Sequence, residues 1–240
     1  MVYTSVDNQY VKSLKKLTIK KHRDNENLFL IEGEHLILEA YKCGLLEAVI
    51  VPENMDFKID VKTIYVSNNV LKYLSELETP TIIGVCKKMK EKELGDRILF
   101  LDDIQDPGNL GTIIRSAAAF NVDTIVLSSN TVDLYNSKVL RATQGMVFNI
   151  NVIKRELLYF ARELKEKGYL VYATKVNGGK SLKDIEKAKK FVIIMGNEGA
   201  GVKEELLNLA DQYLYIDMSK KCESLNVGVA TSIILYEFSK

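Results

Sequence analysis

Cysteine and histidine are both scarce in this 240-residue sequence. The three cysteines, Cys43, Cys86 and Cys222, are widely separated and form no CxxC pair, which argues against a disulfide framework and against a structural zinc site. The two histidines, His22 and His35, both lie within the first ninety residues. The rest of the chain therefore has no imidazole for a catalytic triad or a metal cage. We expect no metal, and any chemistry in the second half must proceed without histidine.

The sequence also lacks long apolar runs and a net charge of either sign. No apolar segment is long enough to span a membrane, and residues 1–10 lack the charged and apolar regions of a secretory signal. We therefore expect a cytoplasmic protein. Lysine and arginine number 33 against 32 aspartates and glutamates, so the overall charge does not require a nucleic-acid partner. Any basic surface must be local.

The sequence does have a regular alternation of apolar runs with amphipathic segments, which predicts an α/β fold. In the first ninety residues, strands are predicted at 28–31, 46–51, 63–66 and 81–86, and helices at 34–42 and 67–77. The polar, lysine-rich residues 87–96 interrupt the pattern. We therefore predict a small α/β domain over residues 1–92 and a second α/β domain over residues 97–240. Strands of the second domain are predicted at 98–101, 124–127, 169–174, 191–195 and 212–216, and helices from 110, near 137–143, and at 156–167, 202–209 and 225–238.

Residues 6–23 are predicted to form a helix that carries the strongest basic cluster in the chain. Apolar residues recur at helical spacing, and lysines crowd the remaining faces. The candidate contacts with an RNA phosphate backbone are Lys15, Lys16, Lys20, Lys21 and Arg23. A solvated helix face is the commoner meaning of such a pattern, so both interpretations stay open.

Residues 100–120 are the stretch where we expect chemistry. A short buried strand runs into Pro107 and Gly108, which predict a sharp turn, and Asn109 is then a good N-cap for the helix that follows. Arg115 lies beside the apolar stripe of that helix. A helix N-terminus with a nearby guanidinium favours anionic groups such as phosphate. An ordinary strand-to-helix connection with a surface arginine has the same pattern.

Two further glycine-bearing segments, 196–201 and 217–228, also follow predicted strands. The spacing GxxGxG of the first differs from the GxGxxG of dinucleotide sites, and the Gly179-Lys180-Ser181 ending of a phosphate-binding loop lacks its first glycine. Ligands in open α/β sheets gather beyond the carboxyl ends of the strands, so all three polar segments are expected to line one site. Glu198 would be a carboxylate in that site. Ser224 is the predicted N-cap of the last helix, and Asn226 offers a short amide near its start.

Taken together, these segments resemble the SpoU, or TrmH, branch of the SPOUT class of RNA methyltransferases. LDDIQDPGNLGTIIRSAAAF resembles its first motif, IIMGNEGAGV its second and IDMSKKCESLNVGVATSIILYE its third. The three motifs occur in order across nearly all of residues 97–240. The first ninety residues are similar, more weakly, to the ribosomal-protein-like substrate-binding domain that several members carry.

The resemblance implies methyl transfer from S-adenosylmethionine to a ribose 2′-hydroxyl of RNA, on a parallel sheet whose C-terminal segment is threaded into a deep trefoil knot. It also implies a homodimer formed through the C-terminal domain. The residues that would surround the cofactor are Thr174, Gly196, Ile216, Met218 and Leu225. The residues that match the family's polar active-site set are Asn109, Arg115, Glu198, Ser224 and Asn226. Asp217 departs from the family pattern, where proline is common, and adds a negative charge near the cofactor pocket.

We expect the substrate to be rRNA rather than tRNA, because an added RNA-binding domain suits a structured target. A tRNA ribose methyltransferase, a non-catalytic RNA-binding module of the same fold and transfer to a base nitrogen are the competing hypotheses. Arg115 has two candidate roles. The family's proposed base role requires a strongly perturbed guanidinium. The other role is binding an RNA phosphate and stabilising the forming alkoxide.

Overall fold

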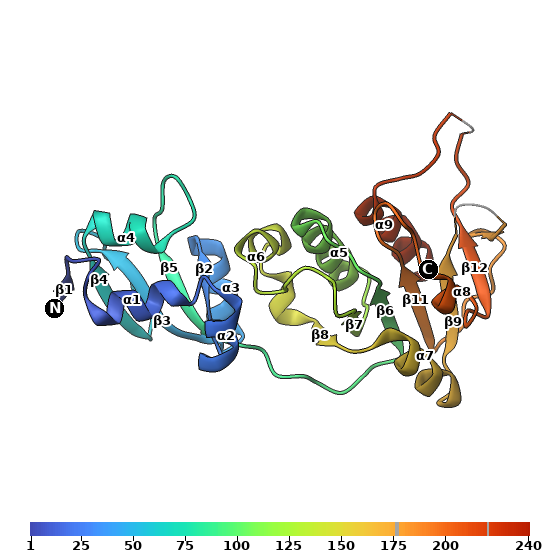
Figure 1. The fold of residues 1–240 in the computed structure, drawn as a ribbon, viewed down its shortest axis with the longest axis horizontal. Coiled ribbons are helices and arrows are strands. Elements are labelled where there is room, and N and C mark those ends of the chain that lie inside the picture. Colours follow the sequence, from blue (N-terminus) through green and yellow to red (C-terminus); the bar gives the residue numbers. More distant parts are fainter. Residues whose placement is uncertain (176–177, 220) are drawn as a thin grey trace. The chain divides into compact units, whose positions relative to one another are not determined.

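The computed structural model describes residues 1–175, 178–219 and 221–240, so Lys220 of the third motif lies outside the description. The chain divides into two compact units (Figure 1). Unit 1 comprises Met1–Lys90 and Asp133–Phe148, and unit 2 comprises Glu91–Val132 and Asn149–Lys240. Within the described ranges, no helix is both long and apolar enough to cross a membrane.

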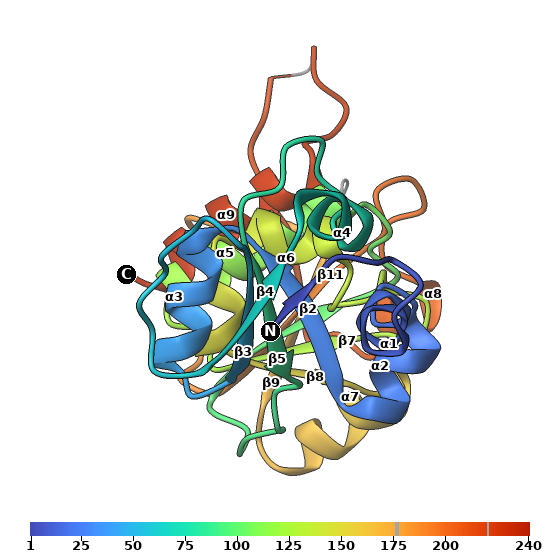
Figure 2. The same ribbon diagram turned by 90° about the vertical axis from the view of Figure 1, so that its left-hand side faces the viewer.

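Unit 1 is built on a five-stranded mixed sheet with the strand order β1-β4-β3-β5-β2. The strands are β1 (Val2–Tyr3), β2 (Leu28–Glu32), β3 (Leu46–Pro52), β4 (Lys62–Val66) and β5 (Ile83–Lys87). The helices of residues 1–90 are α1 (Gln9–Lys16), α2 (Lys20–Glu26), α3 (Glu34–Lys42) and α4 (Asn68–Leu74). Apolar side chains of α1 and α4 pack in one core against β3, β4 and β5. Figure 2 shows α1 and α3 on opposite sides of these strands.

The helix predicted over residues 6–23 is in fact two helices, α1 and α2. Leu17 is buried between them, and the guanidinium of Arg23 donates hydrogen bonds to the carbonyls of Leu17 and Thr18. These donors satisfy carbonyl groups at the end of α1 that a continuing helix would otherwise use. Arg23 is 7% exposed and also forms an ion pair with Asp133. The charge of Arg23 is neutralised by Asp133 inside unit 1. The prediction that Arg23 contacts an RNA phosphate is therefore wrong.

Residues 133–148 belong to unit 1 although they fall in the second half of the sequence. This segment contains α6 (Ser137–Thr143) and most of a short 3-10 helix (Met146–Asn149). The ring centroid of Tyr135 lies 4.7 Å from that of Phe29, and Phe148 lies 6.5 Å from the same ring. The single domain boundary predicted within residues 87–96 did not anticipate this return of the chain.

Unit 2 is built on a seven-stranded sheet in which every strand pair is parallel, with the order β10-β12-β9-β11-β6-β7-β8. The predicted α/β fold with a parallel sheet is thereby confirmed. The strands are β6 (Arg97–Leu101), β7 (Thr124–Leu127), β8 (Asn151–Lys154), β9 (Leu170–Thr174), β10 (Lys180–Ser181), β11 (Phe191–Met195) and β12 (Gln212–Tyr215). The helices are α5 (Pro107–Ala119), α7 (Leu157–Glu166), α8 (Glu204–Leu207) and α9 (Val227–Phe238).

Helices cover both faces of this parallel sheet, which explains why its central strands are apolar on both sides. One core joins α7 and α8 to alternate residues of β6, β9 and β11. On the other face, the ring of Phe238 in α9 lies 5.1 Å from that of Tyr172 and 5.2 Å from that of Phe191. Figure 1 shows α5 and α9 together on this side. The sheet is therefore fixed between two helical layers, and its strand ends form a rigid base for loops.

Candidate active site

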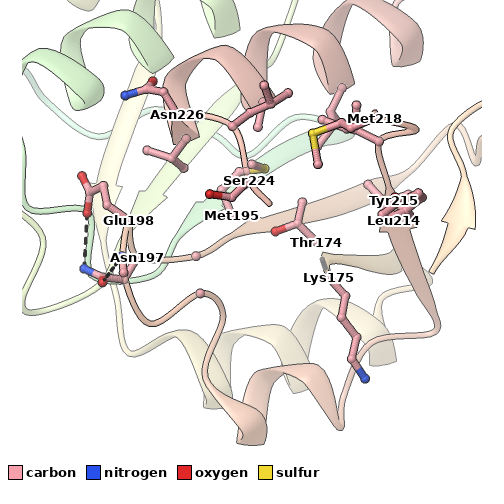
Figure 3. Close-up of a pocket in the computed structure, with 18 residues that line it drawn as sticks. Thr174, Lys175, Met195, Asn197, Glu198, Leu214, Tyr215, Met218, Ser224 and Asn226 are labelled. Carbon is pink, nitrogen blue, oxygen red and sulfur yellow. Dashed lines mark hydrogen bonds between the residues drawn. The ribbon is translucent and has the colours of Figure 1, made fainter. Parts of the chain in front are cut away.

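A cavity of about 380 Å³ opens at the carboxyl ends of β9, β11 and β12. Thr174, Met195 and Tyr215 are the last residues of these three strands, and all of them line the cavity. The loops that follow the strands supply the rest of the wall. Figure 3 shows Glu198 and Asn226 toward one end of this space and Met218 and Tyr215 toward the other. The cavity has the size and position that ligand sites in α/β sheets have.

The structure brings nearly all of the predicted site residues to this cavity. The five residues predicted to surround a cofactor all line it: Thr174, Gly196, Ile216, Met218 and Leu225. Of the predicted catalytic set, Glu198, Ser224 and Asn226 also line it. Asn109 is hydrogen-bonded to two of these three. Arg115 is exposed on α5 and does not line the cavity.

The loop after β11 is folded tightly on itself. Asn197 and Gly201 exchange two backbone hydrogen bonds of 3.0 Å, and the side-chain oxygen of Asn197 accepts from the N–H groups of Gly199 and Ala200. A Cβ atom on Gly196 would lie 2.1 Å from the carbonyl carbon of Gly201. Gly196 is therefore required by the closeness of two backbone segments. This fold of the loop holds Glu198 at the rim of the cavity.

Glu198 is the centre of the polar side of the site. Its Oε1 accepts hydrogen bonds from the side-chain amide of Asn109 at 3.0 Å and from the N–H of Asp106 at 3.2 Å. Partial burial works against its charge, but the hydrogen bonds from Asn109 and from backbone N–H groups outweigh burial, and the pKa of Glu198 is lowered from its ordinary value of 4.5. Glu198 is therefore an ionised hydrogen-bond acceptor at neutral pH.

The helix caps differ from the prediction at both α5 and α9. Asp106, rather than Asn109, caps α5, because its carboxylate accepts from the N–H of Asn109 at 2.8 Å, and Pro107 and Gly108 form the first turn. Asn226, rather than Ser224, caps α9 through its Oδ1. The side-chain amide of Asn226 is then free to donate to Asn109 Oδ1 at 2.8 Å. Asn109 thus bridges Glu198 and Asn226, which come from the second and third motifs.

A second polar cluster, which is hydrogen-bonded to the loop after β11, could not be recognised from the sequence pattern alone. Lys203 Nζ lies 2.8 Å from Asp103 Oδ2 and 3.0 Å from Asp102 Oδ1. The contact with Asp102 Oδ1 is an ion pair that lacks the geometry of a hydrogen bond. Asp102 is 1% exposed, and Asp103 has a φ of +57°. The carbonyl of Asp103 accepts a 2.8 Å hydrogen bond from the side chain of Asn197. The sequence signal for this cluster was two adjacent aspartates directly after a buried strand, which is an unusual place for uncompensated charge.

The third motif is held against the first by packing of α9 on α5. Ser116 and Ser232 form a 2.7 Å hydrogen bond between hydroxyl groups, and the rings of Phe120 and Tyr236 lie 5.8 Å apart. Arg115 projects from the same helix α5, and within the described part of the chain it makes no hydrogen bond or ion pair. Its guanidinium is therefore accessible to an external anion.

The cavity suits a ligand that combines an apolar ring with a cationic centre. Its wall contains the apolar side chains of Leu214, Ile216, Leu225, Val227 and Ile234. Among the described residues, Glu198 is the one carboxylate in the wall, and it is ionised at neutral pH. Lys175 also borders the cavity, but its ammonium lies 4.8 Å from the ring centroid of Tyr213, and Figure 3 shows its side chain pointing away from the other labelled groups. S-adenosylmethionine, with an adenine and a sulfonium, has this combination of groups.

The same residues offer no set of metal ligands. Across residues 1–175, 178–219 and 221–240, no three histidine, cysteine, aspartate or glutamate side chains are grouped so that they could hold a metal ion. Among the described residues, Cys86 and Cys222 form no disulfide.

Comparisons with known proteins give matches over both parts of the sequence. Residues 96–236 match the SpoU rRNA Methylase family, and residues 8–84 match an MRM3-like substrate binding domain. One relative is the 23S rRNA (guanosine(2553)-2'-O)-methyltransferase RlmP of Bacillus subtilis (strain 168). It is 41% identical over 239 residues, which cover 97% of this chain and 96% of the relative.

Two solved structures are similar over the whole chain. An AdoMet-bound rRNA methyltransferase from Sinorhizobium meliloti has a TM-score of 0.87 and 30% identity, with 99% of this chain and 97% of that chain covered. A structure described as an RNA 2'-O ribose methyltransferase has a TM-score of 0.84 and 29% identity, with 99% and 98% covered.

Proposed function

The chain belongs to the SpoU rRNA methylase family, and we propose that it transfers a methyl group from S-adenosylmethionine to a ribose 2′-hydroxyl of 23S rRNA. The observation that carries this proposal is the bridge made by Asn109. It joins Glu198 and Asn226, from the other two motifs, at the rim of one cavity. The guanosine that the Bacillus subtilis relative modifies is the first position to examine, because that relative matches nearly the full chain.

Thr174, Gly196, Ile216, Met218 and Leu225 would hold the cofactor, which supplies an activated methyl group when bound. The chain's own contribution is positioning, because a sulfonium methyl requires neither a metal nor a covalent enzyme intermediate. Glu198, Asn109 and Asn226 form a fixed set of donors and acceptors on one side of the cavity, and the hydroxyl of Ser224 lies at its wall. We propose that this set orients the ribose hydroxyl, as positioning mechanisms require.

The ribose hydroxyl must also lose a proton during the transfer. We propose that Arg115 binds an RNA phosphate beside the site and stabilises the developing negative charge on the ribose oxygen. Its exposure and its lack of a partner among the described residues support this role. An Arg115→Ala variant, assayed separately for RNA binding and for turnover, tests it. Turnover that survives intact would exclude both this role and the alternative role of general base.

The proposed function is tested by mapping alkali-resistant positions in 23S rRNA from cells with and without the gene. A 2′-O-methyl group removes the internal nucleophile, so the adjacent phosphodiester resists hydrolysis. We expect one resistant position that disappears on deletion and returns with purified protein and S-adenosylmethionine. A methylated base with a labile phosphodiester, or a resistant position in tRNA, would refute the proposal. Absence of S-adenosylmethionine binding in calorimetry would favour a non-catalytic RNA-binding module.

We propose that residues 1–92 form the RNA-binding domain and residues 97–240 the methyltransferase domain, from which the segment 133–148 returns to unit 1. The match of residues 8–84 to a substrate binding domain supports the first assignment. Lys15, Lys16, Lys20 and Lys21 remain candidate RNA contacts, although Lys20 forms an ion pair with Asp24. An enzyme that acts on rRNA would work in the cytoplasm.

We propose that the connection between β12 and α9 is threaded to form a deep trefoil knot. β12 lies near one edge of the sheet, whereas α9 packs on α5, which follows the more central strand β6. The connecting chain must therefore pass the carboxyl ends of β9 and β11, where the loop after β11 is also closed on itself. A crystallographic trace of this connection tests the threading, and an unthreaded trace would refute it.

We also propose that the protein is a homodimer that uses α9. Val229, Ile233 and Tyr236 are 47%, 38% and 54% exposed and share one face of this helix. A second copy would present the same apolar stripe, as a two-fold interface requires. Light scattering on the purified protein should give twice the mass of the chain, and Ile233→Glu should give the monomer. A monomeric wild type at micromolar concentration would contradict the proposal.

A further inference from the structure

Two contacts between lysines and aromatic rings lie on the side of unit 1 that is covered by α1 and α4. The apolar faces of these helices share one core, so their outward faces are neighbours. Lys15 of α1 places its Nζ 5.2 Å from the ring centroid of Tyr73 in α4, and Tyr73 is 37% exposed. Figure 2 shows that α3 covers the other side of the strands. Lys15 and Tyr73 thus join the two helices at the surface.

The second contact extends this surface toward the edge of the sheet. Lys62, the first residue of β4, places its Nζ 5.2 Å from the ring centroid of Tyr10 in the first turn of α1. The ring of Tyr10 in turn lies 5.4 Å from that of Tyr3 in β1. We call the surface formed by Tyr10, Lys15, Lys16, Lys62, Lys72 and Tyr73 the α1/α4 face.

The lysines of the α1/α4 face carry charge that the protein does not neutralise. Within the described residues, Lys15, Lys16, Lys62 and Lys72 form no ion pair with a carboxylate. Two basic residues of α2 differ, because Lys20 pairs with Asp24 and Arg23 pairs with Asp133. The structure therefore divides the basic cluster of residues 15–23 and leaves an anion-binding surface at α1 and α4.

The combination of groups favours RNA over other anionic partners. Lysines alone would suit any phosphate or an acidic protein, but the exposed ring of Tyr73 and the half-buried ring of Tyr10 add flat surfaces on which unpaired bases stack. The ammonium of a lysine lies over one face of each ring, where it can contact the phosphate that follows a base stacked on the same tyrosine. We infer that the α1/α4 face binds an unpaired segment of the RNA substrate, with Tyr73 and Tyr10 as stacking residues. This inference rests on the proposed function for the identity of the RNA.

Direct binding of the full chain to two probes tests the inference. The probes are a transcript of 23S rRNA centred on the guanosine that the Bacillus subtilis relative modifies, and a single-stranded oligouridine. Tyr73→Ala should weaken binding to both by about 10-fold, since loss of base stacking on an aromatic ring has an effect of this order. Tyr73→Phe keeps the ring and should bind as the wild type does. Affinity for S-adenosylmethionine, measured by calorimetry, should not change in either variant.

Two controls separate stacking from charge and from folding. Tyr159 of α7 is 69% exposed and has Arg162 6.0 Å from its ring, so Tyr159→Ala removes a similar pair from unit 2 and should leave RNA binding unchanged. The double variant Lys15→Gln with Lys16→Gln should weaken RNA binding. It should also make the slope of log affinity against log salt concentration shallower, by about 0.7 for each single-strand phosphate that is no longer neutralised. Tyr73→Ala should leave that salt dependence unaltered.

The outcomes distinguish the inference from the proposed function. Suppose that Tyr73→Ala binds both probes as tightly as the wild type does while rRNA is methylated normally. The inference that the α1/α4 face binds RNA is then wrong, and the proposed function stands. If the wild type methylates no rRNA but binds oligouridine, and the Tyr73→Ala variant loses this binding, RNA binding by the α1/α4 face is supported and the proposed function is wrong. A wild type that binds neither probe overturns both.

Discussion

Asn226 donates a hydrogen bond of 2.8 Å from its side-chain amide to the side-chain oxygen of Asn109, a residue that lies 117 positions earlier in the chain. The same Asn226 side chain accepts from the N–H groups of Gly228 and Val229 and so caps α9. One side chain therefore starts a helix and connects the third motif to the first. Substitutions at this position can separate the two roles.

Asn226→Asp should keep the cap and lose the connection. The aspartate retains an oxygen for the helix N–H groups and adds a favourable charge at the N-terminus of α9, but it has no N–H for Asn109. We expect an unchanged melting temperature and a kcat lowered about 2- to 10-fold, the loss expected for a hydrogen bond between neutral groups worth about 0.5–1.5 kcal/mol. Asn226→Ala should in addition lose about 1 kcal/mol of stability. Equal kcat in Asn226→Asp and wild type would show that the connection does not matter.

Gly196→Ala should prevent the loop after β11 from closing. The added Cβ would lie 2.1 Å from the carbonyl carbon of Gly201 and 2.2 Å from the nitrogen of Val202, both of them backbone atoms that cannot rotate away. We expect a loss of about 1–3 kcal/mol or more in urea unfolding and weaker S-adenosylmethionine binding. Gly199→Ala is the matched control for stability, because its Cβ would come no closer than 3.7 Å to the atoms around it. Similar stability losses in both variants would contradict this explanation.

Glu198 should make stability depend on pH in a defined direction. Its pKa in the folded protein is lowered from 4.5 by hydrogen bonds that outweigh burial. The charged form therefore stabilises the folded state above pH about 4.5, and this contribution disappears as the pH falls through the lowered pKa. The difference in unfolding free energy between wild type and Glu198→Gln should be largest near neutral pH and should shrink on acidification. A difference that stays constant with pH would show that the charge of Glu198 is not stabilised by these contacts.

Lys203→Met should destabilise the contact between the turn after β6 and the residue that follows the second motif. The substitution leaves the buried carboxylate of Asp102 and that of Asp103 without their cation, and we expect a loss of about 1–3 kcal/mol in urea unfolding. Lys203→Arg should recover part of it. Lys190→Met is the control, because Lys190 and Asp96 form an exposed pair at 3.7 Å and such pairs contribute about 0–1 kcal/mol. Equal losses at the two positions would argue against a special role for Lys203.

Local patterns in the sequence were sufficient for most of the secondary structure. The strands predicted at 98–101, 124–127 and 191–195 are confirmed as β6, β7 and β11, because continuous apolar runs of this length are typical of strands buried on both faces. The helix boundaries were less accurate. α8 is shorter than the predicted helix at 202–209, and β8 was not predicted. Helix ends depend on which side chain reaches the free N–H and carbonyl groups, and spacing alone does not decide that.

The sequence by itself determined that three polar segments would meet at one site, because the carboxyl ends of parallel strands share an edge of the sheet. In addition, all five residues that were predicted from the sequence to surround the cofactor line the cavity. Only the tertiary structure decided how individual side chains are used. Asp106 takes the cap and frees Asn109 to bridge Glu198 and Asn226, and Asp133 holds Arg23 inside unit 1. These choices depend on contacts between residues about 90 to 120 positions apart, which no local pattern records.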